Sequence, residues 1–302
     1  MTPSVLNAGF IGLGTMGQPM ALKLCQGGIA LSVHNRTSAR AEALVAAGAR
    51  MADSPSGAAE GKDILFLNVA DDEALAAVMF GPRGAAEGLK PGSLVVDLGT
   101  TSLAATRAFS TRLGERVVTW LDAPVSGGEA GARAGTLSIM VGGPAEAFAR
   151  SLPLLRLMGQ NIVHMGDTGA GQVAKACNQI LVSATLLGVA EAITFARREG
   201  VDPARVRQAL LGGFAYSRIL EVHGQRMLDE NFPPGFKARL HLKDLGLVLG
   251  EADARGLDLT VTAQAHRVME ALVAGGGGEL DSSALIHVVH AMSLADGHLP
   301  PF

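Results

Sequence analysis

A single lysine stands near the start of a long apolar stretch that contains no proline between Gly169 and Arg198. Lys175 is followed three and four residues later by Asn178 and Gln179, so on a helix the three side chains share one face. A lysine on a buried helix is uncommon and usually has a partner or a role. Its ammonium could donate a proton to a carbonyl oxygen as hydride arrives at the carbon. Alternatively, the side chain follows the apolar surface to the edge of the helix, where water solvates its charge.

A glycine string close to the first residue is typical of a site for dinucleotide phosphates. Gly12, Gly14 and Gly17 form G-x-G-x-x-G between an apolar run, 8–11, and a helical segment, 18–26. In such a turn the first glycine makes the tight bend and the second lets a pyrophosphate approach the backbone. The third lets the helix pack closely on the strand. The following helix would offer its N-terminal N–H groups to the phosphates.

The residues after the second expected strand bear on the choice of cofactor. An NAD site usually holds the ribose 2′-OH with an Asp or Glu about 20 residues beyond the glycines. This sequence has Asn35-Arg36-Thr37 there, without a carboxylate. Arg36 can pair with a 2′-phosphate, while Asn35 and Thr37 can add neutral hydrogen bonds. We therefore expect NADPH as the preferred cofactor, with NADH possible; alternatively, Arg36 is only a surface residue.

The loop 122–128 also follows an expected strand. The hydroxyl of Ser126 and the N–H groups of Gly127 and Gly128 would make a small anion cradle suited to a carboxylate. The alternative is a plain turn rich in proline and glycine. Lys243 could approach such a site from the second half of the chain, or could be a solvated helix lysine paired with Asp244 or another acid.

Two more loops, 68–72 and 97–102, lie where the strands of an α/β sheet end and where such sheets bind ligands. On spacing alone they could contact a cofactor. They could equally be capped turns, with Asp72 and either Thr101 or Ser102 as helix N-caps.

Composition narrows the class of protein. The chain has 302 residues, which suits two domains, and its formal net charge of −3 provides no basic field for nucleic acid. Its two cysteines cannot form a disulfide framework, and no signal peptide is visible, so we expect a cytoplasmic protein. We expect no membrane segment, because no apolar stretch approaches the roughly 20 residues that a membrane helix needs. We also expect no metal site.

The two halves of the chain have different patterns. Short apolar runs alternate with helical segments up to about residue 165, which predicts a parallel, doubly wound sheet. The run 136–141 alternates polar and apolar residues at first, so we expect it in a smaller antiparallel or mixed part of the sheet. The expected strands are 6–11, 31–34, 63–69, 94–98, 117–121, 136–141 and 162–164.

From residue 166 to 302 we expect an all-α domain, entered through one long buried helix at about 169–198. The expected later helices are 203–211, 216–230, 240–255, 260–274 and 282–294, with a flexible loop at 275–278.

Three segments together resemble the β-hydroxyacid dehydrogenase family, which includes 3-hydroxyisobutyrate dehydrogenases and tartronate semialdehyde reductases. They are the N-terminal signature 10–21, the loop 122–128 and the lysine-bearing segment 169–179. The resemblance covers essentially the whole chain. It implies an N-terminal Rossmann-type sheet domain, residues 1–165, followed by an all-α substrate and oligomerisation domain, residues 166–302. The segments 210–215, 231–236 and 240–245, and the Asn178-Gln179 pair, most resemble the tartronate semialdehyde reductase subgroup.

The resemblance also implies roles for individual residues. Lys175 would be the general acid/base. The substrate would be held by Ser126, Gly127, Gly128, Asn178, Gln179 and Lys243. The cofactor would be held by Gly12, Leu13, Gly14, Thr15, Met16, Gly17, Asn35, Arg36, Thr37, Asn68, Val69, Thr100, Phe236 and Lys243.

We therefore expect a reversible reduction of tartronate semialdehyde to D-glycerate with NADPH. The alternatives are 3-hydroxyisobutyrate, glyoxylate or succinic semialdehyde as substrate, or a non-catalytic NADP-binding scaffold. Because the second half is rich in apolar residues, we expect a homodimer or homotetramer built through it; a monomer could bury the same helix internally.

Overall fold

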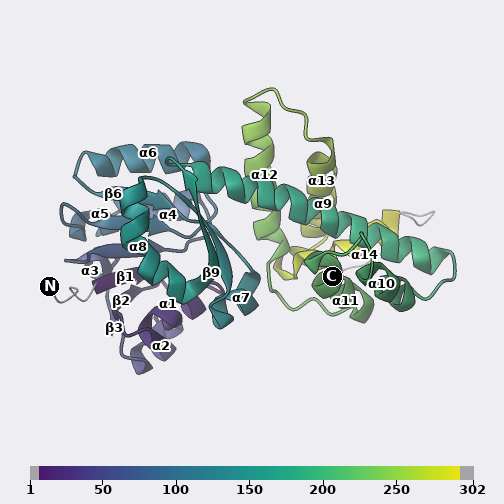
Figure 1. Cartoon of the computed structure of the whole chain (residues 1–302), viewed down its shortest axis with the longest axis horizontal. Helices are drawn as coiled ribbons and strands as arrows, with labels where there is room; N and C mark the ends of the chain where they lie inside the picture. Colours follow the sequence, from purple (N-terminus) through teal and green to yellow (C-terminus); the bar gives the residue numbers. More distant parts are fainter. Residues whose placement is uncertain (1–6, 293–302) are drawn as a thin grey trace. The chain divides into compact units, whose positions relative to one another are not determined.

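The computed structural model describes residues 7–292 and divides into two compact units. The N-terminal unit ends at Lys175 and the helical unit begins at Ala176, so the long helix α9 (Ala170–Arg198) runs through the division. Each unit is described by itself below. Figure 1 shows the order of the elements along the chain.

The N-terminal unit is built on a nine-stranded sheet. Neighbouring strands follow the order β3-β2-β1-β4-β5-β6-β8-β7, and β9 pairs with β8. The pairs from β3 across to β6 are parallel, whereas β8 runs antiparallel to β6 and β7 and parallel to β9. The strands are β1 (Asn7–Ile11), β2 (Ala30–His34), β3 (Arg50–Met51), β4 (Ile64–Leu67), β5 (Leu94–Asp97), β6 (Thr119–Asp122), β7 (Val125–Ser126), β8 (Leu137–Gly142) and β9 (Gly159–Gly166).

Helices cover both faces of this sheet. Successive side chains of a strand point to opposite faces, and β1 shows the result: Phe10 joins one buried cluster and Ile11 another. The first cluster packs under α1, α2, α7 and α8, and the second under α3, α4, α5 and α6. These helices are α1 (Gly17–Gln26), α2 (Glu42–Ala46), α3 (Pro55–Ala59), α4 (Asp72–Phe80), α5 (Ala85–Gly88), α6 (Leu103–Gly114), α7 (Gly128–Ala134) and α8 (Ala145–Met158), with a 3-10 turn η1 (Ser38–Ala41) before α2.

The doubly wound sheet with helices on both faces is confirmed. The mixed character expected of 136–141 is also confirmed, because β8 is the strand where pairing turns antiparallel. The two-residue strands β3 and β7 were missed, since runs this short carry no periodic signal.

The helical unit packs around a second core. Its helices after α9 are α10 (Pro203–Leu211), α11 (Arg218–Asp229), α12 (Ala238–Asp253), α13 (Thr260–Ala274) and α14 (Ile286–Met292). Apolar side chains from α9, α11, α12, α13 and α14 share one buried cluster. The all-helical prediction is confirmed for the described residues. The prediction of a flexible loop at 275–278 was wrong in part, because a 3-10 turn η2 (Gly277–Glu279) forms there and Gly277 is buried against Leu272.

The expectation of a helix buried nearly all round was wrong for α9. Leu181 and Phe195 are 69% and 68% exposed, while Leu186 and Ile193 lie in the core. By length and composition alone α9 could also cross a membrane, contrary to our expectation for the chain. Half of its most apolar 18-residue segment is buried inside the protein, and core helices of soluble proteins can be equally long and apolar. The length and composition of α9 therefore support a membrane span only weakly.

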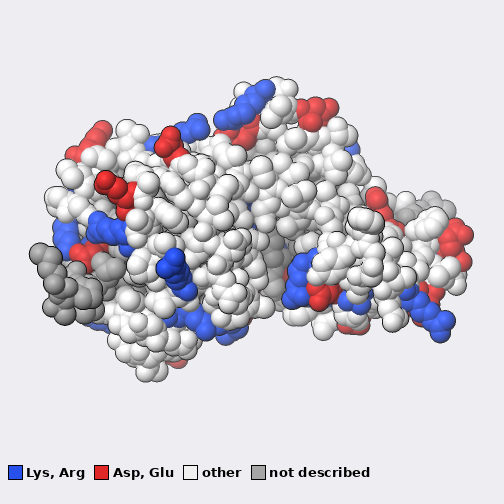
Figure 2. Space-filling model, in the orientation of Figure 1, with Lys and Arg blue, Asp and Glu red and all other residues white. Residues whose placement is uncertain are grey.

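Charged side chains of both signs are interspersed over the face seen in Figure 2, with broad uncharged areas between them.

Candidate active site

The glycine loop between β1 and α1 has the geometry that a phosphate site needs. Gly12 has φ +95°, and a Cβ there would lie 2.2 Å from the Asn68 carbonyl oxygen. A Cβ at Gly17 would lie 1.9 Å from the Gly12 carbonyl oxygen, so this position must be glycine for the helix to pack. Around Gly14, in contrast, no described atom lies within 4 Å of an added Cβ. Gly14 therefore borders open space at the turn, next to the N-terminus of α1, which no described side chain caps.

Asn35, the residue directly after β2, holds this loop in place through two hydrogen bonds. Its Oδ1 accepts a hydrogen bond from the Leu13 N–H at 2.9 Å, and its Nδ2 donates to the Thr37 carbonyl oxygen at 2.9 Å. The Asn35 side chain thus ties the glycine loop to the residues after β2, whereas from the sequence we expected it to contact the cofactor. Arg36 and Thr37 are exposed beside it, as is Thr15, while the Leu13 side chain is buried in the core.

The loops after β4 and β5 lie at the same edge of the sheet, because these strands are parallel neighbours. Asn68, Val69 and Thr100 are half-buried on them. The capping prediction for α6 is confirmed, since the Ser102 hydroxyl accepts from Ala105 N–H. The prediction for α4 was wrong. Asp71 caps that helix, and the Asp72 carboxylate instead accepts the Ser102 N–H at 3.0 Å, which joins the two loops.

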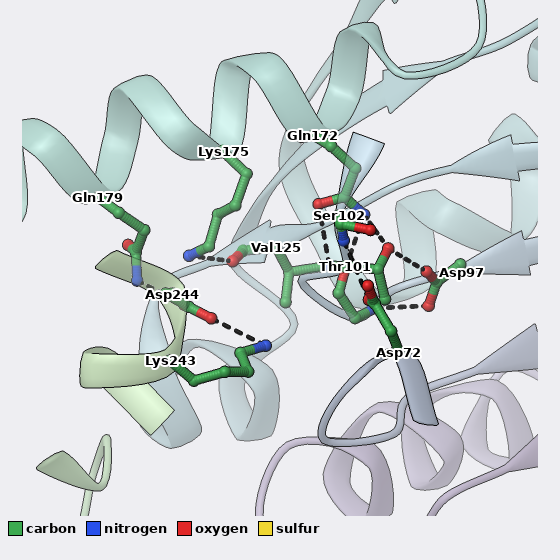
Figure 3. A network of polar contacts seen from close by, with 11 residues as sticks. Asp72, Asp97, Thr101, Ser102, Val125, Gln172, Lys175, Gln179, Lys243 and Asp244 are labelled. Carbon is green, nitrogen blue, oxygen red and sulfur yellow. Dashed lines mark hydrogen bonds and ion pairs between the residues drawn. The ribbon is translucent and has the colours of Figure 1, made fainter. Parts of the chain in front are cut away.

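Gln172, in the first turn of α9, connects the β5 loop to the helix that carries Lys175 (Figure 3). Its Nε2 donates to the Gly99 carbonyl oxygen and to Thr101 Oγ1, both at 3.0 Å, and its Oε1 accepts the Thr101 N–H at 3.3 Å. Thr101 Oγ1 in turn donates to the carboxylate of Asp97 at 3.1 Å. We did not identify Gln172 from sequence, although its position three residues before Lys175 places it on the same helix face.

Lys175 is 7% exposed, and its Nζ donates to the Val125 carbonyl oxygen at 3.1 Å. The structure thus places the lysine ammonium at the segment that leads directly into Ser126. Gly127 and Gly128 follow with φ +134° and +62°, conformations that L side chains rarely adopt. No described atom lies within 4 Å of a Cβ added at Gly128, so the backbone there is approachable.

Asp122 occupies the end of β6, at the start of the same loop, and is fully buried. Its Oδ1 accepts the Gly169 N–H at 2.7 Å and its Oδ2 accepts the Gln172 N–H at 2.9 Å. Burial raises the pKa of the Asp122 carboxyl, while the backbone hydrogen bonds oppose that shift. Asp122 was included in the expected loop, but its contact with the start of α9 was not foreseen.

On the next turn of α9, inside the helical unit, half-buried Asn178 and buried Gln179 begin a chain of polar contacts that reaches buried Asp244; Gln179 and Asp244 are seen in Figure 3. Asn178 Nδ2 donates to Gln179 Oε1 at 2.8 Å, and Gln179 Nε2 donates to Asp244 Oδ2 at 2.7 Å. Lys243 Nζ lies 3.0 Å from Asp244 Oδ1, as in the alternative that paired these two residues. Asp244 therefore orients both Gln179 and Lys243, a role that sequence spacing did not reveal.

Phe236 lies on the segment before α12, and buried Asp281 holds that segment. Asp281 Oδ2 accepts the N–H groups of Gly235 and Phe236 at 3.2 and 3.0 Å. His223 and Arg226 of α11 lie 3.2 and 2.7 Å from its carboxylate. Burial alone would raise the pKa of the Asp281 carboxyl. Hydrogen bonds from His223 and Ser283, the charge of His223 and the Phe236 N–H outweigh burial and hold this pKa well below its usual range.

Replacing Asp281 by Asn is expected to lower the free energy of unfolding of the helical unit by about 3 kcal/mol at neutral pH, because a buried ion pair loses one partner. A carboxyl with a depressed folded pKa contributes stability above its unfolded pKa of about 3.9. That contribution is lost as pH falls through the lower folded value. Thermal melting of wild type and variant should therefore differ most near neutral pH, and the gap should narrow in acid. An equal gap at all pH values, or one no larger than that of exposed Asp229→Asn, would contradict this account.

Comparison with known proteins agrees with the geometry. Residues 7–166 match the family model described as the NAD binding domain of 6-phosphogluconate dehydrogenase. Residues 169–289 match the model described as NAD-binding of NADP-dependent 3-hydroxyisobutyrate dehydrogenase.

Full-length relatives are also similar. The chain is 45% identical over 288 residues to 2-hydroxy-3-oxopropionate reductase of Escherichia coli (strain K12), covering 95% of this chain and 98% of the relative. It is 39% identical over 252 residues to 3-hydroxyisobutyrate dehydrogenase of Pseudomonas aeruginosa, covering 81% and 85%. A crystal structure of 3-hydroxyisobutyrate dehydrogenase from Salmonella typhimurium superposes with TM-score 0.86 at 30% identity, covering 93% and 99%. The glycine loop, the serine-glycine-glycine loop and the buried lysine thus occur in a chain that belongs to the β-hydroxyacid dehydrogenases, the NAD(P)-dependent oxidoreductases that include the 3-hydroxyisobutyrate dehydrogenases.

Proposed function

We propose that the protein reduces tartronate semialdehyde (2-hydroxy-3-oxopropanoate) to D-glycerate with NADPH, reversibly, and that Lys175 is the general acid/base. The observation that carries the proposal is the buried Lys175 ammonium held 3.1 Å from the carbonyl oxygen of Val125, next to Ser126. The similarity to the 2-hydroxy-3-oxopropionate reductase supports this choice of substrate.

The residues of the glycine loop fit a dinucleotide. The open space at Gly14 and the positive φ of Gly12 suit a pyrophosphate that approaches the backbone. The N–H groups at the start of α1 would bind its oxygens. When bound, NADPH supplies the hydride that reaches the aldehyde carbon of the substrate.

The protein's own residues would do the rest. Ser126, Gly127 and Gly128 would bind the substrate carboxylate through a hydroxyl and backbone N–H groups, and so fix the aldehyde in one orientation. Lys175 would donate a proton to the forming alkoxide oxygen, and would take it back in the oxidative direction. Asn178 and Gln179, one turn further along α9, would bind the 2-hydroxyl.

Arg36 supports the choice of NADPH because its exposed guanidinium follows β2 without a neighbouring carboxylate at residues 35 and 37. Replacing Arg36 by Ala is expected to raise the KM for NADPH by roughly tenfold or more, because a charge-assisted contact with the 2′-phosphate is lost. The KM for NADH should change little. Steady-state kinetics with both cofactors checks this, with Arg205→Ala as a control for loss of an exposed arginine. Equal effects on both cofactors would contradict the assignment.

The substrate choice is tested with two aldehyde acids that differ in one group. Tartronate semialdehyde carries a 2-hydroxyl where 2-methyl-3-oxopropanoate, the aldehyde that corresponds to 3-hydroxyisobutyrate, carries a methyl group. A site lined by amide side chains should favour the hydroxyl, because the methyl leaves buried polar groups unpaired. We expect kcat/KM to be at least about tenfold higher for tartronate semialdehyde. The reverse order would support 3-hydroxyisobutyrate as the substrate instead.

Glyoxylate and succinic semialdehyde complete this substrate panel. NADPH binding without turnover on any of the four would support the non-catalytic scaffold.

We also propose a cytoplasmic location and a homodimer or homotetramer formed through the helical unit. The exposed apolar side chains of Leu181 and Phe195 on α9 support such an association.

A further inference from the structure

The first turn of α9 is held by side chains and backbone groups from two different strand ends. Asp122, at the end of β6, accepts both the Gly169 and the Gln172 N–H groups, although 47 and 50 residues separate them in sequence. Such N–H groups at the start of a helix usually donate to a Ser, Thr or Asp side chain that is close in sequence. Here they donate to the first residue of loop 122–128, so the same hydrogen bonds join that loop to the helix.

The fit around Asp122 is tight. A Cβ added at Gly142 would lie 2.7 Å from both carboxylate oxygens, and one at Gly171 would lie 2.8 Å from Oδ2 and 2.4 Å from the Met140 carbonyl oxygen. Glycine at these two positions lets β8 and α9 close around the carboxylate. The anion also lies at the positive end of the helix dipole, which lowers the free-energy cost of burying it.

The same turn is fixed to the β5 loop through Gln172. Its amide makes hydrogen bonds to Gly99 and Thr101, while its backbone N–H is the group that Asp122 accepts. Lys175 follows three residues later, about one helical turn along. Two buried side chains, Asp122 and Gln172, thus connect the first turn of the lysine-bearing helix with loop 122–128 and with the β5 loop.

We propose that Asp122, together with Gln172, is a positioning residue for Lys175: it registers the first turn of α9 against the loop that carries Ser126. This inference rests on the proposed role of Lys175 in proton transfer. Asp122 is buried behind the loop and takes no proton in the reaction. It acts through the place at which it holds the lysine.

The test compares the wild type with Asp122→Asn, which keeps the shape but replaces one acceptor oxygen with a donor that faces an N–H group. The first readout needs no substrate. The chain has six lysines, so the 13Cε resonance of Lys175 can be assigned in the full-length protein by its loss in Lys175→Arg. We expect Asp122→Asn to shift this resonance and leave the five others in place.

The second readout is a single turnover of the preformed NADPH complex with the aldehyde acid that the wild type reduces fastest. Misplacement of a reacting group by about 1 Å can cost about a hundredfold in rate. We therefore expect the rate constant of Asp122→Asn to fall roughly ten- to hundredfold. A purely structural cap would lower only the amplitude, in proportion to the folded fraction. Ser54→Ala, which removes the buried cap of α3 in the same unit, is the matched control and should leave both the resonance and the rate constant unchanged.

An unshifted Lys175 resonance or a wild-type rate constant in folded Asp122→Asn would overturn the inference. If that variant does not fold, Gln172→Met takes its place, because it cuts the bonds to Gly99 and Thr101 and keeps the backbone N–H that Asp122 accepts. An unshifted resonance in Gln172→Met would overturn the inference equally. Failure of the wild type to reduce any aldehyde acid would instead overturn the proposed function, while the resonance still decides whether Asp122 positions the lysine.

Discussion

Replacing Lys175 by Ala is expected to lower kcat by roughly 10²–10⁴, the usual contribution of a positioned general acid. The Kd for NADPH should stay within about twofold, because the glycine loop that would bind the phosphates is built from other residues. Lys175 is buried, and its Nζ donates to the Val125 carbonyl oxygen at 3.1 Å. Stopped-flow turnover and fluorescence titration with NADPH measure the two quantities separately.

Lys175→Arg separates charge from proton transfer. Arginine keeps the positive charge and donors, but it stays protonated in proteins, so it cannot act as the acid/base. We expect it to be nearly as slow as Lys175→Ala. Lys90→Ala, which removes a surface lysine paired with Asp63, should keep wild-type kcat. Wild-type turnover in Lys175→Ala would mean that another group protonates the substrate.

Gly14→Ala is expected to raise the Kd for NADPH roughly ten- to hundredfold, because its methyl group would enter the space where the pyrophosphate approaches the backbone. Its melting temperature should match that of the wild type, since no described atom lies within 4 Å of the added Cβ and φ is not in the left-handed region. Isothermal titration with NADPH and thermal melting together check this prediction.

Gly12→Ala is the matched comparison two residues earlier. A Cβ there would meet the Asn68 carbonyl oxygen at 2.2 Å, at a φ of +95°. This variant should lose stability as well as NADPH binding. If Gly14→Ala bound NADPH like the wild type, the cofactor phosphates would have to lie elsewhere.

Much of the N-terminal unit was predictable because local signals and tertiary structure agree there. Buried parallel strands such as β4 and β5 are continuous apolar runs, and the glycine loop has a fixed spacing. The N-cap of α4 was assigned to Asp72 instead of Asp71 because two adjacent aspartates offer the same local signal. Only the three-dimensional structure shows that Asp72 reaches the Ser102 N–H.

The reactive groups of the candidate site were predictable from the sequence, whereas the residues that hold these groups in place were not. Lys175 and the loop with Ser126 stand out by residue type and spacing. Asp122, Gln172 and Asp244 act through hydrogen bonds to groups 50, 73 and 65 residues away, and no sequence period encodes such pairs. The exposed side of α9 was also missed. The apolar pattern of a helix predicts burial, but it does not show whether other parts of the same chain cover every face.

The central claim is tested most directly by giving the purified wild-type protein tartronate semialdehyde and NADPH, and identifying the product by chiral analysis. We predict that NADPH is oxidised in step with the formation of D-glycerate, and that both cease in Lys175→Ala. NADPH that binds but is not oxidised, or turnover that persists in Lys175→Ala, would contradict the account.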